Sequence, residues 1–434
     1  MNLNFLMVKE KEEQMHPKNN RTTIIIGLFG LFILSAFSAA AQNLQYVLKP
    51  SYQYSVISNY SEGLSRVEIS ADSTGFIDRS GQLILKLNRY YNDVYDFHNG
   101  MARVKKVTKE GTLYGYINKK GKLVIPLEFS EAKDFSDHRA MVYKDYWQVI
   151  NRKGETVLGD SLLITEIHND QGGYDVEPPS FHDGLLLTRR NGKYGYVDTL
   201  GKRIIPCQYD LALDFSDGAA IVTQNIPNND SLFHSKKGNN EYVKTLDDIY
   251  HNLPGEDYST QRMIINKKGK VVYTFQKDTY PNLQENFSDG IIGFYDDRKK
   301  GFVNTQGEII VAAKYGNNPY PLPYSNGVSI IQIRGEKSDN SDGYMKLVDT
   351  EGKTISEIPF QTKFGLMYDS NLAYHEGLLA VKILVKDQGY LWGYMDKQGH
   401  FVIEPQFNKT LNFYEGRAVV VTQEGSVGII KNPL

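Results

Sequence analysis

Short runs of alternating apolar and polar residues recur along most of the chain, and turns rich in glycine separate them. In the clearest copy, the alternation over Met101–Val104 predicts a half-buried strand. The tyrosines of Tyr114-Gly115-Tyr116-Ile117 share one face of a second strand. Leu123–Ile125 predicts a third strand, which we expect to end at Pro126 because proline has no N–H for the ladder.

A four-residue loop that begins with Asp or Asn and ends with Gly joins the second and third strands of each copy. In Asn118-Lys119-Lys120-Gly121, the first side chain can bond its own backbone, and the glycine can take a positive φ. These Asp and Asn residues resemble a ladder of metal ligands, but hairpin chemistry accounts for all of them. The other copies are Asp78–Gly81, Asn151–Gly154, Asp198–Gly201, Asn266–Gly269, Asn304–Gly307, Asp349–Gly352 and Asp396–Gly399.

An aromatic residue followed by a Ser-Asp-Gly-type turn opens each copy and leads into its first strand. His182-Asp183 lies in one such turn and could suggest an acid–base pair, but the histidine occupies the serine position of the repeat, which favours a turn. The turns are Tyr60–Gly63, Phe97–Gly100, Phe135–His138, Phe181–Gly184, Phe215–Gly218, Phe287–Gly290, Tyr324–Gly327, His375–Gly377 and Phe413–Gly416.

A period of a few tens of residues predicts a repeat fold in which each unit buries its apolar face against its neighbours. We therefore expect an all-β protein, a tandem array of about eight three-stranded antiparallel units. Tyr46–Tyr52 matches Phe401–Phe407, a third strand, whereas the chain ends with the first two strands of a unit. Head and tail together complete one unit, as in a closed propeller-like ring. Irregular spacing between units favours an open curved array, which we prefer, and the closed propeller-like ring is the alternative.

The repeat resembles the WG (KWG-type) β-repeat family of bacterial proteins, which is named for a Trp-Gly pair. Trp392-Gly393-Tyr394 is the copy most similar to it, followed by Tyr114-Gly115-Tyr116 and Tyr194-Gly195-Tyr196. The resemblance extends over nearly all of the chain from about residue 44. It implies tandem β-units and a binding or scaffolding role, with no catalytic residue to carry over.

The amino-terminal segment has the parts of a secretory signal. Lys18 and Arg21 precede the apolar stretch Ile24–Phe37, and Ala39-Ala40-Ala41 follows it. An uncleaved anchor is the alternative, but a spanning helix needs about 20 apolar residues. We expect a signal peptide over residues 1–41, no membrane span after cleavage, and export to the periplasm, cell surface or exterior. Translation from Met15 would give a more typical signal.

The composition of the chain argues against several classes of function. The net charge is −2, from 49 Lys and Arg against 51 Asp and Glu, so no basic field favours nucleic acid as a partner. Cys207 is the one cysteine, which rules out a disulfide framework. The histidines are scattered, and the sequence contains none of the common catalytic or nucleotide-binding motifs. We predict no catalytic residue, no metal and no cofactor, and therefore no enzyme.

Residues 42–434 form the predicted repeat array, which segments 159–180, 223–262, 333–342 and 360–374 interrupt. Insertions in repeat proteins map to loops, often on a binding face. The long insert at 223–262 is where we expect a partner contact. The leading hypothesis is an exported binding or scaffold protein for a protein or glycan of the cell envelope. The alternative is a hydrolase or lyase that acts on an envelope polymer.

Overall fold

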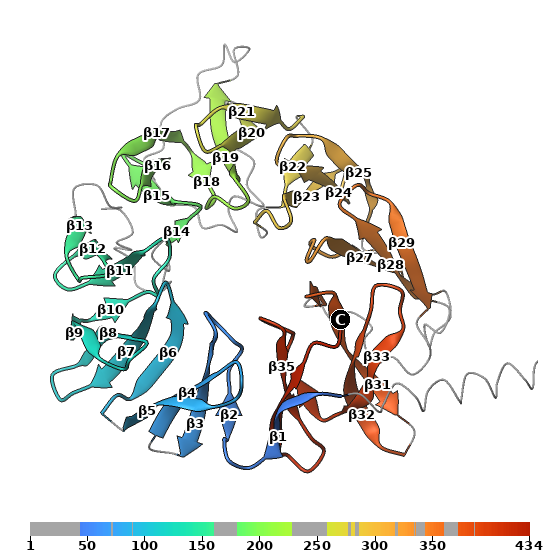
Figure 1. The fold of residues 1–434 in the computed structure, drawn as a ribbon. Coiled ribbons are helices and arrows are strands. Elements are labelled where there is room, and N and C mark those ends of the chain that lie inside the picture. The colour runs from blue at the N-terminus through green and yellow to red at the C-terminus, as the bar shows by residue number, and fades with distance from the viewer. Residues whose placement is uncertain are drawn as a thin grey trace, which may run out of the picture. The chain divides into compact units, whose positions relative to one another are not determined.

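The computed structural model describes residues 44–434 except 71–72, 89, 160–179, 228–257, 277–278, 283–285, 317–319, 334, 336–342, 360–371 and 386. Its strands form nine antiparallel sheets of four strands each, and no helix occurs among the described residues. Figure 1 shows the sheets as blades around a common axis, so this part of the chain is a nine-bladed β-propeller. The predicted signal peptide, 1–41, lies outside the described residues.

Blades 1 to 8 follow the order of the chain, and their strands pair in sequence order. Blade 1 contains β2 (Val56–Ile57), β3 (Leu64–Ser70), β4 (Ser73–Asp78) and β5 (Leu83–Asn88). Blade 2 contains β6 (Asp93–His98), β7 (Met101–Val107), β8 (Thr112–Asn118) and β9 (Leu123–Phe129). Blade 3 contains β10 (Glu131–Ala132), β11 (Arg139–Tyr143), β12 (Trp147–Asn151) and β13 (Thr156–Leu158). Blade 4 contains β14 (Phe181–His182), β15 (Leu185–Arg190), β16 (Lys193–Asp198) and β17 (Arg203–Tyr209).

The second half of the propeller repeats this plan. Blade 5 contains β18 (Leu211–Ala212), β19 (Ala219–Pro227), β20 (Tyr258–Asn266) and β21 (Val271–Thr274). Blade 6 contains β22 (Thr279–Pro281), β23 (Ile291–Asp296), β24 (Lys299–Asn304) and β25 (Ile309–Tyr315). Blade 7 contains β26 (Tyr320–Pro321), β27 (Val328–Ile333), β28 (Tyr344–Asp349) and β29 (Thr354–Pro359). Blade 8 contains β30 (Tyr374–His375), β31 (Leu378–Val385), β32 (Gly389–Met395) and β33 (Phe401–Phe407).

Blade 9 is built from both ends of the described chain. Its strands are β34 (Lys409–Thr410), β35 (Arg417–Val421), β36 (Val427–Lys431) and, outermost, β1 (Tyr46–Ser51). Tyr46 pairs with Ile430, and Leu48 pairs with Ile429, both antiparallel. The closed ring predicted as one alternative is therefore confirmed. The preference for an open array was wrong, because the irregular spacing comes from segments between paired strands and leaves the pairing intact.

The unit is four-stranded rather than three-stranded, and there are nine units rather than about eight. The innermost strand of most blades has only two or three residues, as in Glu131–Ala132, and such a strand is too short for a visible alternation. The ninth unit escapes a count of the Asx-x-x-Gly loops because it is divided between head and tail. Eight Asx-x-x-Gly loops (Asx is Asp or Asn) serve nine blades because the chain ends fall where blade 9 would have its loop.

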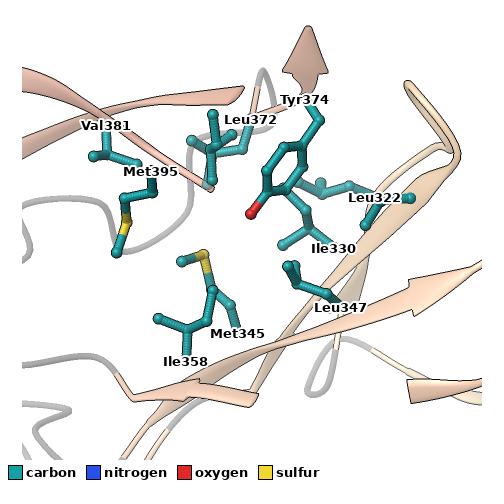
Figure 2. Close-up of a cluster of buried hydrophobic side chains, with 11 residues drawn as sticks. Leu322, Ile330, Met345, Leu347, Ile358, Leu372, Tyr374, Val381 and Met395 are labelled. Atoms are coloured by element: carbon teal, nitrogen blue, oxygen red, sulfur yellow. The ribbon is translucent and has the colours of Figure 1, made fainter. Parts of the chain in front are cut away.

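Neighbouring blades bury apolar side chains against one another, as a repeat fold requires. Figure 2 shows this packing between blades 7 and 8, where Met345 and Leu347 face Val381, Met395 and the ring of Tyr374. All five side chains are almost completely buried. The core is thus a series of inter-blade clusters around the ring.

The glycine of Tyr-Gly-Tyr lets the next strand cross it. In blade 4, Tyr194 pairs with Tyr209 and Tyr196 with Ile205, so β17 bulges over Gly195. A Cβ on Gly195 would lie 2.6 Å from the carbonyl oxygen of Ile205 and 2.7 Å from the nitrogen of Cys207. Proline belongs to this bulge and does not end the strand. The prediction that Pro126 ends the third strand was therefore wrong, since β9 continues to Phe129.

Candidate functional site

The propeller has two chemically different faces. The Ser-Asp-Gly-type turns join the first and second strands of a blade, and the Asx-x-x-Gly loops join the third and fourth. Because antiparallel strands alternate in direction, both sets of turns lie on one face, which we call the turn face. The connections between the second and third strands, and between successive blades, lie on the opposite loop face.

A closed circle of hydrogen bonds runs around the turn face. In each opening turn the side chain before the glycine position accepts the backbone N–H that occupies the glycine position of the next blade, over 2.6 to 2.9 Å. The donors and acceptors are Gly100 and Glu62, His138 and Asn99, Gly184 and Asp137, Gly218 and Asp183, Gly290 and Asp217, Gly327 and Asp289, Gly377 and Asn326, Gly416 and Glu376, and Gly63 and Glu415.

Backbone geometry explains the residue types in this circle. Both central residues of each turn have positive φ, for example 55° at Asp183 and 78° at Gly184. A two-residue hairpin of type I′ requires this, and it favours Asn or Asp followed by Gly. Blade 3 has His138 at the glycine position, with φ 60°. The backbone of these two residues thus forms the turn, and the side chain of the first one binds the next blade.

Ion pairs reinforce the circle between blades 9 and 1 and between blades 1 and 2. Arg79 of blade 1 donates from Nη2 to Glu415 of blade 9 over 2.7 Å. Lys119 of blade 2 lies 3.2 Å from the Glu62 carboxylate of blade 1. Burial alone would raise the pKa of Glu62, but the Gly100 N–H and Lys119 outweigh it and hold that pKa below its usual value.

The Asx-x-x-Gly loops are structural, as predicted. In each loop the Asx Oδ1 accepts two backbone N–H groups; Asp198, for example, accepts those of Leu200 and Lys202, both at 2.9 Å. The same pair of bonds is made by Asp78, Asn118, Asn151, Asn266, Asn304, Asp349 and Asp396. Among the described residues, no three His, Cys, Asp or Glu side chains are grouped to hold a metal.

The aromatic residues of the repeat tie blades together. The ring of Tyr116 packs at 4.9 Å against Phe135 of the next blade, and its hydroxyl donates to the Lys133 carbonyl oxygen over 2.6 Å. Tyr196 makes the same two contacts between blades 4 and 5, with the ring of Phe215 and the carbonyl oxygen of Leu213. Burial raises the pKa of Tyr196 well above its usual value. These tyrosines hold the fold together and are not exposed for binding.

His182 and Asp183 do not form an acid–base pair. Asp183 belongs to the circle of hydrogen bonds, while His182 lies 3.8 Å from Asp214 of blade 5. Burial raises the pKa of Asp214, and His182 partly offsets the effect. Thus the histidine approaches a carboxylate that no sequence pattern indicated.

The loop face carries the exposed tyrosines. Tyr52 is 74% exposed, Tyr90 58%, Tyr390 50% and Tyr146 41%, and each lies at a strand end or connection on this face. Leu384 and Val107 are exposed there as well. Exposed aromatic side chains offer large contact areas at low entropic cost.

Two of these tyrosines are linked by polar side chains across blades 8 and 9. The Gln423 amide donates to Gln388 over 3.4 Å, close in sequence to Tyr390. The Tyr52 hydroxyl donates to the Glu424 carbonyl oxygen over 2.8 Å. We call Tyr52, Gln388, Tyr390 and Gln423 the tyrosine strip, because these two hydrogen bonds lie beside both tyrosines on the loop face.

The strand ends that flank the predicted insertions all lie on the loop face. The residues 160–179, 228–257, 336–342 and 360–371 are outside the described part of the chain. At the longest insertion, predicted at 223–262, β19 and β20 form a hairpin up to the pair Pro227 and Tyr258. Five residues at each end of that segment are therefore part of the sheet.

A comparison with protein families decides the nature of the repeat. The model described as WG containing repeat matches residues 75–106, 114–146, 194–225, 301–336 and 392–425. The chain is a WG-repeat protein. Each matched segment of this WG-repeat protein runs from the third strand of one blade into the next blade, so the sequence repeat and the blade are out of phase. The same phase difference places a fourth strand at the start of the described chain.

No curated protein sequence matches the WG-repeat protein. Among solved structures, BamB from Moraxella catarrhalis is similar at 12% identity and a TM-score of 0.38, over 90% of this chain and all of that one. A structure described as the eukaryotic initiation factor is similar at 9% identity and a TM-score of 0.47, over 84% and 94% of the two chains. Puromycin hydrolase is similar at 10% identity and a TM-score of 0.27, over 75% and 57%.

Proposed function

We propose that this WG-repeat protein is an exported binding protein without enzymatic activity, and that its loop face engages a protein or glycan of the cell envelope. One observation carries the proposal. The exposed tyrosines lie on the same face as the strand ends that flank every long insertion. A propeller repeat is consistent with a binding or scaffold role, and exposed aromatics are the side chains that most often dominate binding energy.

The strip on blades 8 and 9 offers the chemistry that such a partner requires. Tyr390 and Tyr52 are exposed, and Gln388 and Gln423 carry amides that can donate and accept hydrogen bonds. The alternative function, an envelope-polymer hydrolase or lyase, needs acidic or histidine side chains positioned around a bound polymer. Among the described residues, His182 lies 3.8 Å from Asp214, and His400 lies 3.4 Å from Asp396, whose Oδ1 already accepts two backbone N–H groups of its own loop.

The test is binding by the full mature chain to envelope extract and to a glycan array, with Tyr52→Ala and Tyr390→Ala variants. Leu200→Ala is the matched control, because Leu200 is also 74% exposed but lies on the turn face. We expect the tyrosine variants to lose most of the captured partner and the control to retain it. Equal capture by all variants would exclude the tyrosine strip, and turnover of an envelope polymer would favour the alternative.

A second arm tests the long insertion. Pro227 and Tyr258 are paired across the hairpin, so a short Gly-Ser linker between them can close it. Loop length changes closure entropy slowly, and we therefore expect the shortened protein to fold. Loss of partner capture with an unchanged melting temperature would assign the contact to the insertion. A failure to fold would show that the insertion is structural.

A further inference from the structure

A hollow of about 560 Å³ lies on the turn face where blades 1, 2 and 3 meet. Its lining includes Lys119, Lys120, His138 and Arg152, with Glu62 as the one carboxylate. Blade 2 contributes an amide, Asn99, to this lining, at the position of the circle where most blades contribute a carboxylate. By contrast, a second hollow between blades 5 and 6 is lined by both Asp217 and Lys270.

The positive charge in the first hollow is only partly neutralised. Lys119 is occupied by Glu62, through the carboxylate at 3.2 Å and the backbone carbonyl oxygen at 2.9 Å. Lys120 and Arg152 have no acidic partner among the described residues. Two cations that repel each other therefore face one hollow without a compensating anion.

The side-chain acceptors of the hollow, in Glu62, Asn99 and Asn118, are already engaged by backbone N–H groups. The Asn99 Oδ1 accepts the His138 N–H over 2.6 Å, which leaves the amide N–H₂ of Asn99 available. Glu62 already accepts the Gly100 N–H. The guanidinium of Arg152 lies over Gly100, with Nη2 2.8 Å from the place of a Cβ on that glycine. The bare backbone thus makes room for a planar, two-pronged donor.

We propose that this hollow is a binding site for an oxyanion, the carboxylate or phosphate group of a ligand. The Arg152 fork binds two oxygens of such a group, and Lys120 and the Asn99 amide supply further donors. No aromatic side chain lines the hollow, so charge and hydrogen bonding provide the recognition, and sugar stacking does not. The site goes beyond the proposed function, because it lies on the turn face and does not involve the tyrosine strip.

The test is calorimetric titration of the full mature chain with inorganic phosphate and, separately, with trigalacturonate, at constant ionic strength. We expect at least one anion to bind, and Arg152→Gln with Lys120→Gln to weaken it about tenfold to a hundredfold, through loss of charged hydrogen bonds. Lys153→Gln is the matched control, because it removes the same charge from the Arg152 loop but does not line the hollow. Its affinity should equal that of the unaltered protein.

A second variant keeps the fold of the ring and inverts the local charge. Asn99→Asp can still accept the His138 N–H and restores the carboxylate that most blades have. It should weaken anion binding at an unchanged melting temperature. Binding of phosphate alone or of trigalacturonate alone identifies the group that the site takes. Binding of neither, or an equal loss with Lys153→Gln, overturns the proposal.

Discussion

Gly195 provides the sharpest test of how this repeat packs. In Gly195→Ala the new methyl group would lie 2.6 Å from both the Ile205 oxygen and the Pro206 carbonyl carbon, and 2.7 Å from the Cys207 nitrogen. All three atoms belong to the backbone, so no side-chain rotation relieves the overlap. The bulge of β17 must move away, and with it the pairing of Tyr196 with Ile205.

The expected cost follows from these contacts. Overpacking of a well-packed site costs about 1–3 kcal/mol, whereas replacing glycine with alanine returns about 0.4–1 kcal/mol through the unfolded chain. We expect Gly195→Ala to lower the free energy of unfolding by about 1–2 kcal/mol. Gly195→Val places a bulkier side chain in the same overlap and should cost more.

Equilibrium denaturation in guanidinium chloride measures the effect, and Gly316→Ala is the matched control. Gly316 follows β25, has no positive φ, and would find nothing within 4 Å of its new Cβ. The control should be as stable as the unaltered protein or slightly more stable. If both variants unfold at the same midpoint, the close approach of β17 to Gly195 does not limit stability, and the reasoning fails.

Three further outcomes are expected. His138→Gly should raise the free energy of unfolding by up to about 1 kcal/mol, because it relieves the positive φ of 60° at a position where the other blades have glycine; a lower stability would contradict this. Glu415→Ala should cost about 1–3 kcal/mol, measured by denaturation, since it removes the bonds from Gly63 and Arg79; Glu415→Gln, which can still accept the Gly63 N–H, should cost less. Burial raises the pKa of Asp214 in the folded state. The contribution of this carboxyl to the free energy of unfolding is therefore present below its unfolded pKa and is lost as pH rises through its folded pKa. Asp214→Asn should therefore gain stability relative to the unaltered protein as the pH rises above the unfolded pKa of about 4, and parallel pH profiles of the two proteins would refute this.

Much of the fold could be predicted from local patterns. The Asx-x-x-Gly loops were recognisable because their hydrogen bonds join residues two and four positions apart, as at Asp198. The nine opening turns, one per blade, count the blades correctly. The short inner strands were missed because two residues such as Leu211 and Ala212 show no period. Closure of the ring could not be decided from the sequence, because the paired residues Tyr46 and Ile430 lie at opposite ends of the chain.

The circle of hydrogen bonds could not be seen in a single repeat. Asp183 looks like a turn residue, and its φ confirms that role. Its second role, the bond to the Gly218 N–H, depends on the distance between blades, which no local pattern contains. The basic hollow was missed for the same reason. Asn99 and Arg152 belong to different copies of the repeat, and only the ring brings them together.

The pairing of β1 with β36 imposes an order on synthesis. A chain made from its amino terminus produces β1 before the other strands, yet β1 has no partner until β36 has been made. During that interval β1 offers unpaired backbone groups, which invite pairing with other chains. Truncation of only Val427–Lys431 would leave β1 permanently unpaired. Folding of the nascent propeller thus depends on β36, and a variant that lacks β36 should aggregate although eight complete blades remain.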